Sequence, residues 1–61
     1  MKKWYTVYCV EKAIWGALRN VHHYFKTKEN AAEYAKNTEY TSNPYSVKVN
    51  REEYENIEFE D

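Results

Sequence analysis

The sequence predicts a small α+β domain, in which a three-stranded antiparallel sheet carries one helix on a face. Three observations predict this class. Residues 3–10 and 45–50 are rich in Tyr, Val and Thr, which favour strands. Residues 27–37 are rich in alanine and other helix-forming residues. A chain of 61 residues suffices for one domain. We expect that domain to span residues 1–49, with the order strand–strand–helix–strand, and an acidic tail to follow at residues 50–61.

The first strand, residues 3–10, is apolar or aromatic on both sides. Alternation places one set of side chains on each face: Tyr5, Val7 and Cys9 on one, and Trp4, Thr6, Tyr8 and Val10 on the other. A strand without a polar face has no side to turn toward water. We therefore expect it at the centre of the sheet.

Residues 11–25 allow two interpretations. Apolar side chains recur at helical spacing, at Ile14, Leu18, Val21 and Phe25. Against a helix, Gly16 interrupts this stripe and residues 21–25 are of the types that favour strands. We favour a hairpin that turns near residues 13–16 and returns as a strand at 18–26, with the helix as the alternative.

The helix at residues 27–37 has a clear start and end. Thr27 can cap its N-terminus, and Glu29 lies in the first turn, where a negative charge is favourable. Its inward stripe is Ala31, Tyr34 and Ala35. The turn-forming residues 41–44, with one proline, end this region, and a half-buried strand follows at 45–49.

The tail at residues 50–61 also has two interpretations. Asn50 and Glu53 have the spacing of a capping box, which predicts one helical turn. Residues 57–60 alternate and could instead form a short edge strand. Its charge is distinct: residues 1–49 hold eight Lys and Arg against four Glu, whereas residues 50–61 hold one Arg against six acidic residues.

Catalytic and metal-binding patterns are weak. Cys9 is the only cysteine, so no internal disulfide can form, and in an apolar strand we expect an inert thiol. His22 and His23 are adjacent, so their side chains diverge on a strand or a helix. Asp61 is the only aspartate. We expect no enzyme activity, no metal site and no cofactor.

The apolar hairpin tip carries the main functional hypothesis. Turns usually hold Gly, Asn, Asp or Ser, but residues 13–18 read Ala-Ile-Trp-Gly-Ala-Leu. Such a loop either folds back over the sheet or offers an apolar anchor to a partner. We predict the second: a non-enzymatic protein-binding module with Ile14, Trp15 and Leu18 as the anchor. Steering charge would come from the acidic tail, through Glu52, Glu53, Glu55, Glu58, Glu60 and Asp61. The size and composition are typical of phage or mobile-element proteins that act as inhibitors or adaptors on host proteins. A homodimer would reinforce so small a core.

The alternative function is binding of single-stranded nucleic acid. Trp4, Tyr8 and Tyr24 could stack bases on an open sheet face. The pI near 6.1 lacks the basic footprint of such proteins, so we rank this second. The unpaired cysteine and the absence of a long apolar run predict a cytoplasmic protein that does not enter a membrane.

Overall fold

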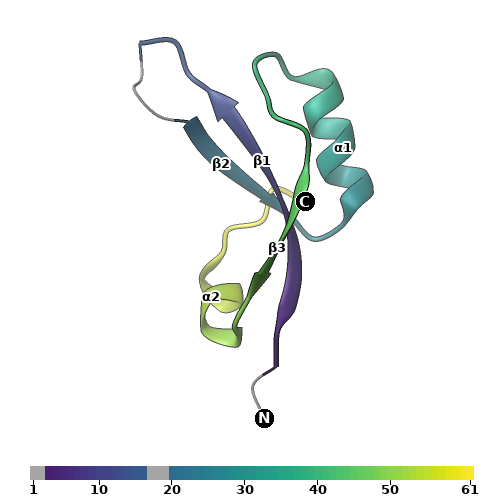
Figure 1. Ribbon diagram of the computed structural model, residues 1–61, viewed down its shortest axis with the longest axis vertical. Helices are drawn as coiled ribbons and strands as arrows, with labels where there is room; N and C mark the ends of the chain where they lie inside the picture. Colours follow the sequence, from purple (N-terminus) through teal and green to yellow (C-terminus); the bar gives the residue numbers. More distant parts are fainter. Residues whose placement is uncertain (1–2, 17–19) are drawn as a thin grey trace.

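The structure is a computed structural model that describes residues 3–16 and 20–61 (Figure 1). Its elements follow the order β1 (Tyr5–Ala13), β2 (Asn20–Phe25), α1 (Lys28–Asn37), β3 (Tyr45–Val49) and α2 (Arg51–Asn56). Within these residues the strands form one antiparallel sheet in the order β2-β1-β3. The predicted α+β class, the hairpin and the central position of the first strand are confirmed. A second helix, α2, adds to the one that was expected.

The register of the sheet assigns each side chain to a face. Cys9 pairs with Tyr24 of β2 and with Tyr45 of β3, so these three side chains share one face. Tyr8 pairs with Phe25 and Ser46, which therefore lie on the other face. In Figure 1, α1 lies to the right of the strands and α2 to their left.

The core beneath α1 is built from small and aromatic residues. Val10, Phe25 and Ala31 are buried together, and Tyr8, Tyr34 and Ala35 pack around them. Thr27 caps the helix, since its Oγ1 accepts a hydrogen bond from the Asn30 N–H over 3.3 Å. The predicted cap and the inward stripe of α1 are thus confirmed.

The opposite face is closed by α2 and the chain that follows it. Val7, Cys9 and Val49 are buried on this face. The ring of Tyr54 in α2 stacks on Tyr5 with centroids 4.7 Å apart, and Phe59 packs on Tyr54 at 5.3 Å. Three aromatic rings therefore cover the end of the sheet where β1 begins.

Residues 57–61 run from α2 to the end of β2. Phe59 forms a parallel bridge with Tyr24, and the Glu60 N–H donates to the Tyr24 carbonyl over 2.9 Å. Each interpretation of the tail thus describes a different part: residues 51–56 are helical, and residue 59 pairs with a strand.

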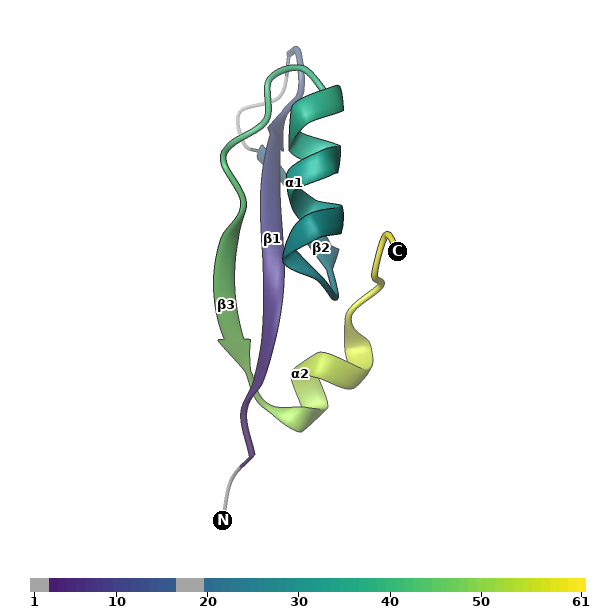
Figure 2. The same cartoon turned by 90° about the vertical axis from the view of Figure 1, so that its right-hand side faces the viewer.

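The far end of β1 pairs with the loop between α1 and β3. The Ala13 N–H donates to the Tyr40 carbonyl over 2.9 Å, and the Ser42 N–H donates to the Glu11 carbonyl over 2.8 Å. Figure 2 shows the hairpin tip and this loop at the same end of the molecule. In the described part of the chain, no helix is long and apolar enough to cross a membrane.

Candidate binding surface

The tip of the β1–β2 hairpin carries its apolar side chains outward. Trp15 is 84% exposed and Ile14 is 47% exposed. The chain turns at Trp15 and Gly16, where Gly16 has a φ of +82°, a value that glycine adopts without steric cost. Leu18, the third residue of the predicted anchor, lies outside the described residues.

Trp15 contacts an aromatic neighbour that no local sequence pattern indicates. Its ring meets the ring of Tyr40 edge to face, with centroids 5.7 Å apart and planes at 83°. Such edge-to-face pairs are favourable because the positive edge of one ring meets the negative face of the other. Tyr40 is 58% exposed and has a φ of +62°, a backbone conformation that a tyrosine rarely adopts. The position of Tyr40 follows from this backbone conformation and from the hydrogen bond that its carbonyl accepts from the Ala13 N–H. No local sequence pattern indicates either feature.

A groove of about 620 Å³ lies between the hairpin tip and the C-terminal end of α1. It is lined by Lys12, Ala13, Ile14, Trp15, Val21, His23, Tyr34, Glu39 and Tyr40. We call its exposed apolar residues, Ile14, Trp15, Val21 and Tyr40, the tip surface. Lys12 and Glu39 give the same groove one positive and one negative charge.

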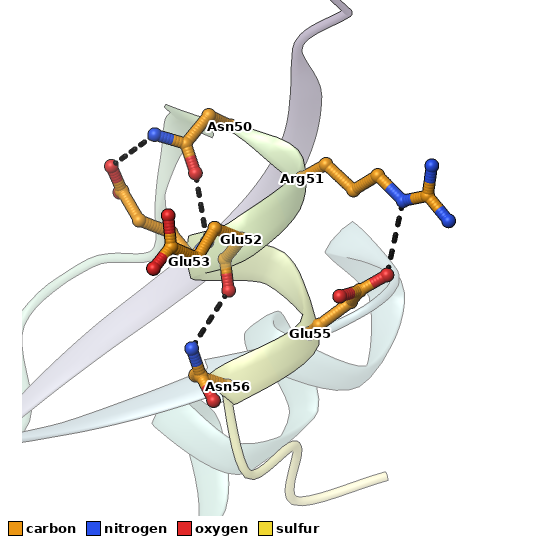
Figure 3. Close-up of polar contacts among 6 residues, drawn as sticks. All are labelled: Asn50, Arg51, Glu52, Glu53, Glu55 and Asn56. Atoms are coloured by element: carbon orange, nitrogen blue, oxygen red, sulfur yellow. Dashed lines mark hydrogen bonds and ion pairs between the residues drawn. The ribbon is translucent and has the colours of Figure 1, made fainter.

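The acidic residues of α2 are occupied mainly with the helix itself (Figure 3). Asn50 caps α2, since its Oδ1 accepts from the Glu53 N–H over 2.8 Å and its Nδ2 donates to Glu53 Oε1 over 3.0 Å. Arg51 Nε donates to Glu55 Oε1 over 3.0 Å. The predicted capping-box pair is therefore present, and Glu53 and Glu55 serve the helix.

Glu60 and Asp61 fold back onto the domain. Glu60 Oε1 lies 3.0 Å from His23 Nδ1. The Asp61 carboxylate accepts from the Lys26 N–H at 3.1 and 3.2 Å and from Asn30 Nδ2 at 2.7 Å. The hydrogen bond from Asn30, with help from the Lys26 N–H, lowers the pKa of Asp61 below its usual value.

All six acidic residues are exposed, and the steering role of their charge stays a prediction. Glu52 and Glu58 are exposed, and their carboxylates make no hydrogen bond or ion pair with the described residues. The others are engaged because the tail folds, which the charge count alone did not indicate.

The three rings of the predicted nucleic-acid face do not share a face. Tyr24 pairs with Cys9, whereas Tyr8 pairs with Phe25 and packs on the core beneath α1. Since neighbours on a strand point to opposite sides, Tyr8 and Tyr24 lie on opposite faces of the sheet. Trp4 is exposed but precedes β1. The prediction of one stacking surface from these residues is wrong.

Cys9 is a buried thiol without the features of a nucleophile. It is 1% exposed, and burial raises the pKa of its thiol. A hydrogen bond with Tyr45 lowers that pKa by less than burial raises it, and the charge of Glu11 raises it a little further. Its cross-strand neighbours are Tyr24 and Tyr45 rather than a histidine. Thiolate chemistry needs a lowered pKa, so the folded environment disfavours it.

His22 and His23 lie on opposite faces of the sheet, as expected. His22 Nε2 lies 3.2 Å from Glu11 Oε1, and His23 contacts Glu60 and the ring of Tyr34. Among residues 3–16 and 20–61, no three His, Cys, Asp or Glu side chains gather in a way that could hold a metal ion.

Comparisons with models of protein families, with curated sequences and with solved structures gave no match. The fold and surface define a small α+β chain with an exposed aromatic tip, and any functional conclusion depends on that geometry.

Proposed function

We propose that this protein is a non-enzymatic protein-binding module that docks through the tip surface. The observation that carries the proposal is the state of Trp15, which is 84% exposed yet fixed against Tyr40. In a chain of 61 residues the core needs its large side chains, so a tryptophan left outside is unusual.

The energetics of such a ring support docking. Tryptophan and tyrosine are enriched among the residues that dominate binding energy, where truncation of one ring costs more than ~2 kcal/mol. A ring already held by a neighbour loses less rotamer freedom when it is buried by a partner. The Trp15–Tyr40 contact therefore favours association at a small entropic cost.

Inhibitor and adaptor roles would both use this surface. An inhibitor would cover a working surface of its partner, and an adaptor would link that partner to another protein. The tip surface supports protein binding of either kind, because one exposed apolar patch with charged neighbours is typical of a docking site.

The test compares two exposed tryptophans. Trp15→Ala removes the tip ring, and Trp4→Ala removes a ring that is 56% exposed beside the start of β1, away from the tip. Each variant and the unchanged protein serve as bait for capture of partners from a lysate of a candidate host. We expect Trp15→Ala to lose the partner, with more than ~1 kcal/mol weaker binding once that partner is purified, and Trp4→Ala to keep it.

A thermal melt accompanies each capture. We expect the melting temperature of Trp15→Ala to stay within about 4 °C of the unchanged protein, because little buried surface is lost. Unfolding of Trp15→Ala would show that the ring belongs to the core. Equal capture by all three baits would show that the tip surface does not dock.

A further inference from the structure

The chain exposes more surface than a folded monomer of its mass needs. Its accessible surface is 5096 Å² for 7.4 kDa, whereas the scaling for monomers gives about 4200 Å². The difference, roughly 900 Å², belongs to the chain as a whole, and it is of the same order as the ~800 Å² that each partner buries in a standard interface. The radius of gyration, 12.3 Å, also exceeds the roughly 10.5 Å expected for this length.

Four of the six large apolar side chains that are exposed among the described residues lie at one end of this elongated molecule, which measures 42 × 25 × 15 Å. These four are the tip surface, and the other two are Trp4 and Tyr45. Figure 1 shows the hairpin and α1 diverging toward that end, and the groove lies between them. Val21 and Lys12 face it from the sheet, because they pair across β1 and β2 on the face that α1 covers. Among residues 3–16 and 20–61, no helix covers this face at the groove.

The charges of the groove suit a copy of the same chain. In a two-fold interface, residue i of one copy meets residue j of the other, and j meets i. A groove with one cation and one anion, Lys12 and Glu39, meets this requirement, since a two-fold axis can bring each lysine to the opposite glutamate. If the groove carried charges of one sign only, the grooves of the two copies would repel each other.

The volume of the groove suits an aromatic side chain. The groove is open, and its volume of about 620 Å³ leaves room for an aromatic side chain. Trp15 lines the groove, so a two-fold axis that passes close to it brings the Trp15 of a second copy to the same groove. The small core also favours this arrangement, since short chains are commonly reinforced by oligomerisation.

We propose that the partner docked on the tip surface is a second copy of this chain, joined about a two-fold axis. Trp15 of each copy lies in the groove of the other, and Lys12 of each lies against Glu39 of the other. This inference rests on the proposed function, because it names the partner of the same surface.

The first experiment measures the mass of the protein by light scattering after size exclusion. The protein concentration is varied from about 1 to about 500 µM, a range that covers weak to moderate dimer affinities. We expect the mass to rise toward twice 7.4 kDa. Trp15→Ala should weaken the dimer at least ~10-fold, since a central aromatic ring dominates such interfaces. Trp4→Ala should leave the dimer unchanged.

The second experiment tests the symmetry through charge reversal. Lys12→Glu and Glu39→Lys should each weaken the dimer about five-fold, because exposed ion pairs are individually weak but each change affects two symmetric contacts. An equal mixture of the two variants should regain the original affinity, since both contacts then pair opposite charges. A pair within one chain would not be rescued by mixing.

A mass of one chain at every concentration would overturn the homodimer. If Trp15→Ala nevertheless lost a captured protein, the proposed function would stand with a different partner. A dimer that persists in Trp15→Ala, or no recovery in the mixture, would also overturn the inference, because the copies would then join through another surface.

Discussion

The two ends of this molecule use aromatic rings in opposite ways. At the end where β1 begins, Tyr5, Tyr54 and Phe59 stack on one another and are half-buried. At the hairpin tip, Trp15 and Tyr40 contact each other and remain exposed. At that end α2 and the tail therefore supply rings that pack on Tyr5, although Trp4, just before β1, stays 56% exposed. At the tip, the described residues provide no such cover.

The backbone shows the same contrast. The C-terminal end is held by hydrogen bonds at both of its ends, at the Asn50 cap and at the Asp61 carboxylate. The tip instead contains the residues with positive φ in the described chain, Gly16 and Tyr40. Backbone strain persists where surrounding contacts enforce it, and it concentrates at functional sites. This difference agrees with the proposal that one end stabilises the fold and the other docks.

The largest expected effect is on stability, and it follows from removing a ring at the covered end. Tyr54→Ala breaks both stacking contacts of that ring, with Tyr5 and with Phe59. We expect a loss of about 2 kcal/mol in the free energy of unfolding, less than for a fully buried ring. Urea denaturation measures it, with Trp15→Ala as the matched change at the tip, expected to cost under ~0.5 kcal/mol. Equal losses of unfolding free energy in the two variants would contradict the proposed difference between the covered end and the tip.

A smaller effect of opposite sign is expected at Tyr40. Glycine adopts a φ of +62° without the steric cost that tyrosine has there. Tyr40→Gly should leave the free energy of unfolding unchanged or raise it by up to ~1 kcal/mol, while it weakens docking through the lost ring. Denaturation and the dimer affinity are measured on the same sample. A clear loss of stability would mean that the Tyr40 ring holds the fold together.

The smallest effect concerns pH and Asp61. The folded-state pKa of this carboxyl is lowered, mainly by the hydrogen bond from Asn30. Its stabilising contribution is therefore complete above the ordinary value near 4, and is lost as the pH falls through the lower folded-state pKa. Because the group is exposed, we expect the contribution to stay under about 1 kcal/mol.

The free energy of unfolding falls as the pH is lowered from about 5 to about 2–3, and Asp61→Asn should remove the part of that fall that Asp61 causes. Glu58→Gln is the matched control, since Glu58 makes no hydrogen bond or ion pair with the described residues and should leave the pH profile unchanged. Identical profiles for Asp61→Asn and the unchanged protein would show that the tail contact adds nothing to stability.

Local sequence patterns predict an element correctly where the residues of the pattern themselves stabilise that element. The alternation of β1, the Thr27 cap with its alanine stripe and the Asn50–Glu53 spacing depend on residues close together in the chain. The return strand of the β1–β2 hairpin is also predicted locally, because residues 21–25 are of types that favour strands. Trp15 and Ile14 were also identified locally, as apolar residues in a turn.

The sequence by itself therefore determined the type and order of the first four elements and the presence of apolar residues in a turn. The tertiary structure showed that Ile14 and Trp15 are exposed there. Only the tertiary structure decided that Tyr40 would meet Trp15, that Tyr8 and Tyr24 would face opposite ways, and that Glu60 and Asp61 would fold onto β2 and α1. These contacts join residues far apart in the chain. They depend on strand register and on a left-handed backbone at one tyrosine, neither of which short-range spacing specifies.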